Sequence, residues 1–116
     1  MSFTYLASPY SPVGDFTPIV KNQLRKQRFE EVCEKAAELM LEGEKIFCPI
    51  AHSHPIEHVG MGEQQTGDFW LDQDLAILAH ANKLKVFRMD GWDKSVGVKR
   101  EIDFAVERGI PIEYVD

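Results

Sequence analysis

Residues 83–101 constrain the fold of this chain more than any other stretch. They open with a short apolar run of strand length, residues 84–89, which Gly91 interrupts before Ser95 offers a cap for a following helix. In an open α/β sheet such a turn lies at the carboxyl edge of the strands, where ligands bind. We therefore expect the function at this turn, on the residues of an S-x-G-x-x-x-E spacing: Ser95, Gly97 and Glu101.

Strand-like and helix-like segments alternate along the rest of the chain. The expected strands are residues 3–7, 46–48, 84–89 and 110–115, and the expected helices are 17–42, 68–81 and 95–108. Ile102, Ala105 and Val106 form the predicted apolar face of the last helix, whereas residues 52–67 read as a long irregular loop. This order predicts right-handed crossovers and a single α/β domain over residues 1–116. The expected fold is Rossmann-like (flavodoxin-like), with three α/β/α layers and a mostly parallel sheet of four to five strands.

Composition excludes several classes of function. The net charge is −6, and the one basic run, residues 21–28, reads as a solvated helix face, so no nucleic-acid partner is expected. No apolar run approaches the roughly 20 residues of a membrane span. Cys33 and Cys48 lie far apart with no signal peptide before them, which favours buried thiols in a cytoplasmic protein. The small core also predicts a homo-oligomer, with residues 52–81 as its contact.

Three groups of polar residues should meet at the carboxyl edge of the sheet. They are Tyr5 with the Ser8, Tyr10 and Ser11 loop, Asp74 with Trp70, and Ser95 with Glu101. Two carboxylates from different helices that face one pocket are what glycosidic chemistry requires. Each signal alone also fits a purely structural role, since a lone helix carboxylate is usually solvated and a lone tryptophan usually packs in the core.

The histidine segment offers a second kind of chemistry. His52, His54 and His58 resemble a metal-ligand set, but they lack a carboxylate or cysteine in register and read better as polar loop content. We therefore predict no metal and no cofactor, and keep a metal-assisted hydrolase as an alternative.

Three motifs in order resemble the nucleoside 2-deoxyribosyltransferase superfamily over nearly the whole chain. The first strand and loop, Tyr5-Leu6-Ala7-Ser8-Pro9, resembles that of the family, and Asp74 lies eight residues before Asn82, as the family's catalytic aspartate precedes a strand-leading Asp. Ser95 to Glu101 resembles the family's S/D-x-G-x-x-x-E motif. Gly91-Trp92 before the serine is similar to a small branch of uncharacterised proteins.

The resemblance implies an N-glycosidase or a 2-deoxyribosyltransferase. Glu101 would attack C1′ of a nucleoside or its 5′-monophosphate, Asp74 would assist base departure, and Tyr5 would orient the glutamate. The substrate would contact Ser8, Tyr10, Ser11, Trp70, Trp92, Ser95 and Gly97. A non-catalytic nucleotide-binding module is the first alternative.

Two expectations concern charge in the pocket. Serine at position 95 favours a 5′-phosphate, because an aspartate there would repel it, and no acidic residue is expected between the Ser8–Ser11 loop and the Ser95 helix. Lys99 and Arg100 depart from the small or apolar residues of the family, and Asn82 from its aspartate. If the two cations point inward, they lower the pKa of Glu101.

Overall fold

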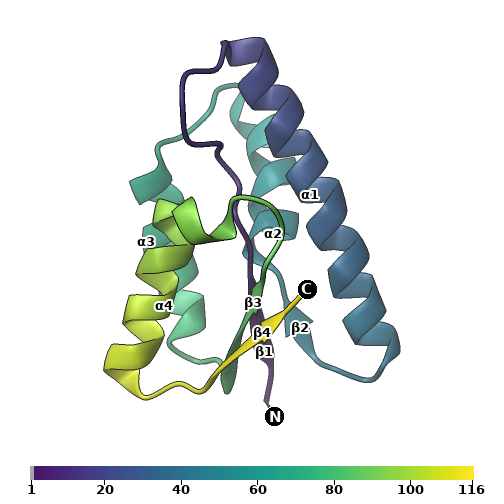
Figure 1. Ribbon diagram of the computed structural model, residues 1–116, viewed down its shortest axis with the longest axis vertical. Helices are drawn as coiled ribbons and strands as arrows, with labels where there is room; N and C mark the ends of the chain where they lie inside the picture. The colour runs from purple at the N-terminus through teal and green to yellow at the C-terminus, as the bar shows by residue number, and fades with distance from the viewer. Residues whose placement is uncertain (1) are drawn as a thin grey trace.

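A parallel sheet forms the middle layer of the protein. The computed structural model describes residues 2–116, and within them four strands, all parallel, lie in the order β2-β1-β3-β4 (Figure 1). Their bounds are Thr4–Ala7 for β1, Ile46–Phe47 for β2, Lys83–Phe87 for β3 and Ile112–Val115 for β4. The mostly parallel sheet that the sequence predicts is therefore confirmed, with four strands.

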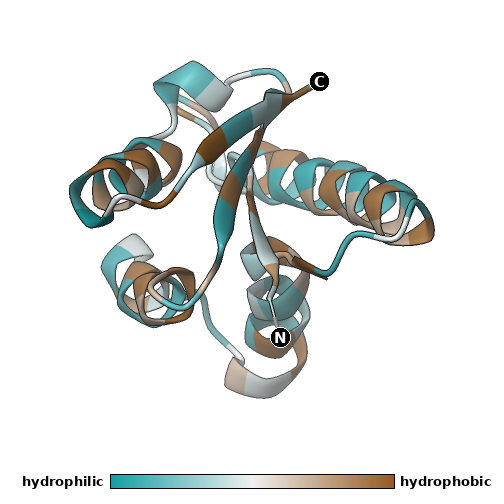
Figure 2. Ribbon diagram, turned by 90° about the horizontal axis from the view of Figure 1, so that it is seen from below, coloured by the Kyte–Doolittle hydropathy of each residue, from teal (hydrophilic) through white to brown (hydrophobic). Residues whose placement is uncertain are grey.

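Helices cover both faces of the sheet, as Figure 2 shows from the end of the strands. They are α1 Pro18–Leu41, α2 Pro49–Pro55, α3 Gly67–Leu78 and α4 Val96–Arg108. Successive side chains of a strand point to opposite faces, so Tyr5 and Ala7 pack with α3 and α4, whereas Leu6 packs with α1 and α2. The predicted three-layer Rossmann-like fold is confirmed.

The capping residues that the sequence suggests begin and end the helices. The side chains of Thr17, Thr66 and Ser95 each accept a hydrogen bond from a backbone N–H three residues on, at the starts of α1, α3 and α4. Gly109 ends α4 with a φ of +71°, a left-handed conformation that favours glycine. Two of these three N-caps, Thr66 and Ser95, come directly before helices that carry site residues.

Two predictions about the helices are wrong. Residues 52–67 are not a long irregular loop, because α2 runs to Pro55 and a π-helical turn, η1 (Ile56–Met61), continues it. Pro49 stands at the first helical position, where its missing N–H costs nothing, so a helix starts directly after β2. Val106 is 68% exposed, and the buried face of α4 is Val98, Glu101 and Ala105 instead.

Within residues 2–116, no helix combines the length and the apolar character needed to cross a membrane.

Candidate active site

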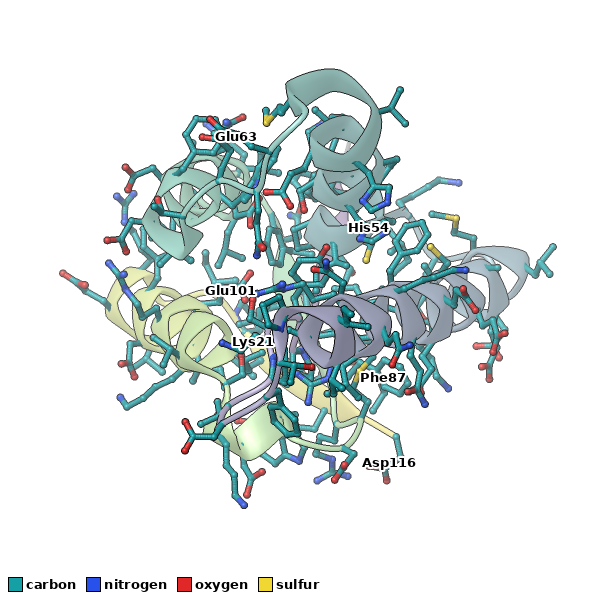
Figure 3. The ribbon with its side chains drawn as sticks, turned by 90° about the horizontal axis from the view of Figure 1, so that it is seen from above. Lys21, His54, Glu63, Phe87, Glu101 and Asp116 are labelled. Carbon is teal, nitrogen blue, oxygen red and sulfur yellow. The ribbon has the colours of Figure 1, made fainter. Side chains whose placement is uncertain are left out.

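The sheet order creates a crevice between β1 and β3. The chain leaves β1 toward β2 on one side and leaves β3 toward β4 on the other, so the two loops that follow these strands diverge at the carboxyl edge. A cavity of about 380 Å³ lies there. Figure 3 views this end of the molecule, and Glu101 lies near its middle. A cavity thus lies at the turn where the sequence predicts the functional site.

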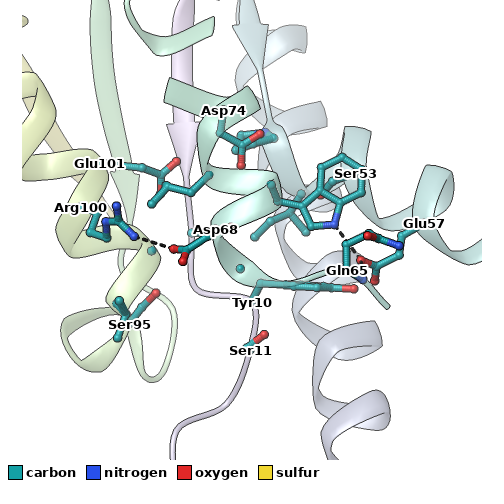
Figure 4. Close-up of a pocket in the computed structure, with 18 of the residues that line it drawn as sticks. Tyr10, Ser11, Ser53, Glu57, Gln65, Asp68, Asp74, Ser95, Arg100 and Glu101 are labelled. Carbon is teal, nitrogen blue, oxygen red and sulfur yellow. Dashed lines mark hydrogen bonds and ion pairs between the residues drawn. The ribbon is translucent and has the colours of Figure 1, made fainter. Parts of the chain in front are cut away.

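Glu101 is the most buried carboxyl group of this cavity. It stands on the inner face of α4, is 5% exposed, and lines the cavity floor together with Asp74 of α3 (Figure 4). The Tyr5 hydroxyl, which rises from β1 on the same face of the sheet, donates a hydrogen bond to Oε2 of Glu101. Strand β1 therefore fixes one oxygen of the carboxylate and leaves Oε1 toward the cavity.

Burial dominates the proton affinity of this group. Desolvation raises the pKa of Glu101 to about 8, and the nearby Asp74 carboxylate adds to the rise, whereas the hydrogen bond from Tyr5 lowers it. Burial likewise raises the pKa of Asp74 to about 7. The pKa of Tyr5 lies well above its usual 10, first through desolvation and then through the charge of Glu101. Burial is thus the main reason that both carboxyl groups hold their protons more tightly than exposed carboxyl groups do.

Lys99 and Arg100 do not lower the pKa of Glu101. Lys99 points outward and pairs with Asp103 one turn along α4, with 2.8 Å between Nζ and Oδ2. Arg100 lines the cavity, but its Nη1 binds Asp68 Oδ1 at 2.9 Å across to α3 (Figure 4). The condition for a lowered pKa is therefore not met, because Lys99 points away from the cavity and Arg100 is paired with Asp68.

The Arg100–Asp68 ion pair shows that the expected absence of acidic residues between the Ser8–Ser11 loop and the Ser95 helix is wrong. Asp68 lines the cavity along with Ser8 and Ser95, so a carboxylate does stand in the region assigned to a phosphate. Its partner Arg100 is the only cation among the described residues that line the cavity. An anionic ligand group would have to compete with Asp68 for this guanidinium.

The Ser8 hydroxyl is buried without a partner. Ser8 is 6% exposed and lines the cavity, yet its Oγ has no hydrogen-bond partner among residues 2–116. A buried hydroxyl left unpaired costs the folded state free energy, of the order of 1–3 kcal/mol. A ligand hydroxyl or phosphate oxygen in the cavity would remove this cost.

The start of α4 supplies further groups. Ser95 and Gly97 line the cavity, and the Ser95 hydroxyl accepts from the backbone N–H of Val98 at 3.2 Å while keeping its own proton to donate. A Cβ added at Gly97 would lie 3.9 Å from Ser95 Oγ, which is ordinary contact. The fold itself therefore does not require glycine at this position.

Most of the other predicted contact residues line the cavity, and one does not. Tyr10, Ser11 and Trp70 are among its walls. Trp92 is not, because it lies in a short 3₁₀ helix (Trp92–Lys94) and its ring packs against Tyr114, with 5.8 Å between centroids. For Trp92 the structure gives a packing role in place of the expected ligand contact.

Sequence analysis missed several lining residues, and Glu57 is the main one. Oε2 of Glu57 accepts from the Trp70 indole N–H at 2.7 Å and from the Gln65 backbone N–H at 2.9 Å. Glu57 lies in the segment read as a loop, and no periodic pattern links it to Trp70. Further missed residues are Ser53, Gln64, Gln65, Asp68 and Arg100.

The side chains of the three histidines pack against aromatic rings and are not arranged as a set of metal ligands. His54 stacks on Phe29 and on His58, and its Nδ1 lies 2.6 Å from the Tyr10 hydroxyl. His52 packs near Phe47. In the described part of the chain, no three His, Cys, Asp or Glu residues are grouped as metal ligands would be.

Comparison with known proteins places the chain in a family. No curated protein matches it. A family model described as a domain of unknown function, DUF1937, matches residues 2–116 and so covers the whole fold and all the cavity residues. On this match the chain belongs to the DUF1937 family of domains.

Proposed function

We propose that this protein cleaves the N-glycosidic bond of a nucleoside or a nucleoside 5′-monophosphate with Glu101 as nucleophile. One observation carries the proposal: Glu101 is buried, bound by the Tyr5 hydroxyl, and shares a ligand-sized cavity with Asp74. Retaining glycosidases use two carboxyl groups in this way. The resemblance of three motifs to the nucleoside 2-deoxyribosyltransferase superfamily supports the same roles.

The reaction would proceed in two displacements. In the first, Oε1 of Glu101 bonds to C1′ as the C1′–N bond breaks; the bonding electrons leave with the base, which takes a proton from Asp74. In the second, water attacks C1′, gives its proton to Asp74, and releases Glu101. Water as acceptor makes the protein an N-glycosidase, whereas a second base in its place makes it a transferase.

The charges of the cavity suit such a transition state. The sugar ring becomes oxocarbenium-like and positive as the bond to the base breaks. Besides the proton donor Asp74, Glu57, Asp68 and Glu101 line the cavity against one guanidinium, so the field favours positive charge at C1′. The hydrogen bond from Tyr5 favours the ionised form of Glu101, which is the form that attacks.

Hydroxyl and N–H groups on two sides of the cavity would hold the sugar. The unpaired Ser8 hydroxyl and the first turn of α4 at Ser95 and Gly97 line one region. A 5′-phosphate there would gain charge-assisted hydrogen bonds, and Arg100 would assist after it leaves Asp68. On this basis a monophosphate should bind at least tenfold more tightly than its nucleoside, and Ser95→Asp should remove that preference.

A panel of nucleosides and 5′-monophosphates, assayed for released base by chromatography, tests the reaction. Glu101→Gln should abolish release by at least a thousandfold, because an amide cannot form the ester. Glu107→Gln, on the exposed side of the same helix, is the matched control and should retain activity. Mass spectrometry of wild-type protein denatured during turnover should find a sugar on Glu101. Full activity of the Glu101→Gln variant would refute the assignment of Glu101 as the nucleophile.

A non-catalytic nucleotide-binding module is the second candidate. The observation that favours it is the raised pKa of Glu101, about 8, which leaves the carboxyl protonated and not nucleophilic at neutral pH in the empty cavity. In that case no substrate of the panel releases base, and Glu101→Gln changes only the affinity.

We also propose that the protein works as a cytoplasmic homo-oligomer. Val59 of η1, Phe69 of α3 and Val96 of α4 are exposed apolar side chains, and they come from the cavity-bearing segments. A neighbouring subunit would cover them and close the cavity. Light scattering that finds a monomer at working concentration would refute this arrangement.

A further inference from the structure

Glu57 is a charged wall residue that the proposed displacement does not use. It comes from η1, and Figure 4 shows it on the other side of the cavity from Glu101. Trp70 and Asp74 line the same cavity. Both hydrogen bonds to its carboxylate fall on Oε2. Among residues 2–116, no hydrogen-bond donor reaches Oε1. No lysine, arginine or histidine of the described chain forms an ion pair with Glu57.

Helix α3 sets the order of these residues along the cavity wall. Trp70 precedes Asp74 by four residues, which is one helical turn and about 6 Å along the axis. The indole N–H of Trp70 then reaches onward to Glu57. A base that leaves C1′, with Asp74 at its glycosidic nitrogen, would therefore lie along Trp70, and its far edge would face Glu57. This step rests on the proposed function.

The polar groups at that end have a defined pattern. The Glu57 carboxylate is only an acceptor, whereas the side-chain amides of Gln64 and Gln65, which also line the cavity, can donate. A matching base edge presents N–H donors toward the carboxylate and a carbonyl toward an amide. The edge of a 2-amino-6-oxopurine does so, with two adjacent donors followed by a carbonyl.

We infer that Glu57 selects a guanine-type base. Adenine places a ring acceptor beside its amino group, and that acceptor would face the carboxylate charge. A pyrimidine is shorter and leaves the space before Glu57 unfilled. The cavity shows an independent sign of a missing ligand, because the buried Ser8 hydroxyl in the same walls has no partner.

A purely structural role for Glu57 makes a different prediction. If it only ties η1 to α3, Glu57→Gln should change little, because the amide oxygen of glutamine still accepts from the Trp70 and Gln65 N–H groups. If Glu57 reads a base, the same substitution removes the charge and turns the free oxygen into a donor, which opposes the N–H groups of guanine.

Binding measured by calorimetry in a Glu101→Gln background, where no turnover occurs, tests the inference. The probes are 2′-deoxyguanosine, its 1-methyl derivative, which lacks the ring N–H, and 2′-deoxyadenosine. Deoxyguanosine should bind at least tenfold more tightly than the other two, and Glu57→Gln should remove that advantage while changing deoxyadenosine affinity less than threefold. Glu63→Gln, an exposed neighbour outside this cavity, should leave all three affinities unchanged.

The outcomes separate the inference from the proposed function. Equal affinities for the three probes, or an equal loss for all of them in Glu57→Gln, would overturn the role of Glu57 even if the wild-type protein releases base. Selective binding of deoxyguanosine without release by the wild-type protein would support the role of Glu57 and overturn the reaction.

Discussion

Replacing Glu101 by glutamine should make the folded protein more stable, although it should destroy the proposed activity. The pKa of Glu101 rises from 4.5 to about 8 on folding, chiefly through desolvation. Each unit of pKa difference corresponds to 1.36 kcal/mol, so ionised Glu101 lowers the free energy of unfolding by about 4–5 kcal/mol above pH 8. Glutamine has no charge to desolvate, and its amide oxygen can still accept the hydrogen bond from Tyr5.

The sign of the pH dependence follows from proton binding. Between pH 4.5 and 8 the unfolded chain has lost the Glu101 proton while the folded chain keeps it, so stability falls as pH rises through this window. The advantage of Glu101→Gln should therefore grow from about 2 kcal/mol at pH 6 to about 4–5 kcal/mol at pH 9.

Urea denaturation followed by tryptophan fluorescence at pH 6 and pH 9 measures this difference. Glu107→Gln on the exposed side of α4 is the control and should show no such trend. A Glu101→Gln protein that is less stable than wild type at pH 9, or an advantage that does not grow with pH, would show that Glu101 is not held in a desolvated environment. The reasoning about its proton affinity would then be wrong.

Three further predictions follow from single contacts of the site. Tyr5→Phe should lower kcat for base release at least tenfold with little change in KM, since it removes the hydrogen bond that favours ionised Glu101; an unchanged kcat would contradict this role. Gly97→Ala should raise the free energy of unfolding by about 0.5–1 kcal/mol, as helix propensity predicts, yet weaken substrate binding at least tenfold in calorimetry because the added methyl group narrows the cavity. Arg100→Ala should weaken binding of a monophosphate more than binding of its nucleoside, whereas Lys99→Ala, which removes an outward cation, should affect neither.

The sequence predicts the sheet and three of the helices because their signals are local. Short apolar runs mark the strands and period-3.6 patterns mark the helices, and Thr17, Thr66, Ser95 and Gly109 lie where these helices begin and end. Parallel strands bring their carboxyl ends to one edge, so the meeting of Tyr5 with Glu101 follows from strand order and alternation. The part of the site that depends on such regular geometry was predictable.

The histidine segment was not predictable in the same way. Its helix passes through Pro55 and continues as a π-helical turn, which disrupts the period that marks a regular helix. Glu57 reaches the cavity only because this turn directs it to Trp70, 13 residues later. For Trp92 the sequence suggested a ligand contact that the structure does not show. Its place in a loop beside Ser95 pointed to the ligand site, but its ring packs against Tyr114 of β4.

Two groups that lower the stability of the folded protein lie in the same cavity. A carboxyl group whose pKa burial raises to about 8 and a hydroxyl without a partner both line the crevice between β1 and β3. Each costs folding free energy in the empty protein, and neither is needed to form the sheet or to pack the helices. A sugar with hydroxyl groups for Ser8 and a developing positive charge beside Glu101 would relieve both costs at once. Unmet interactions of this kind, confined to a ligand-sized cavity, favour a site that completes its bonding only with a substrate, and they support the proposed glycosidic reaction over a non-catalytic nucleotide-binding module.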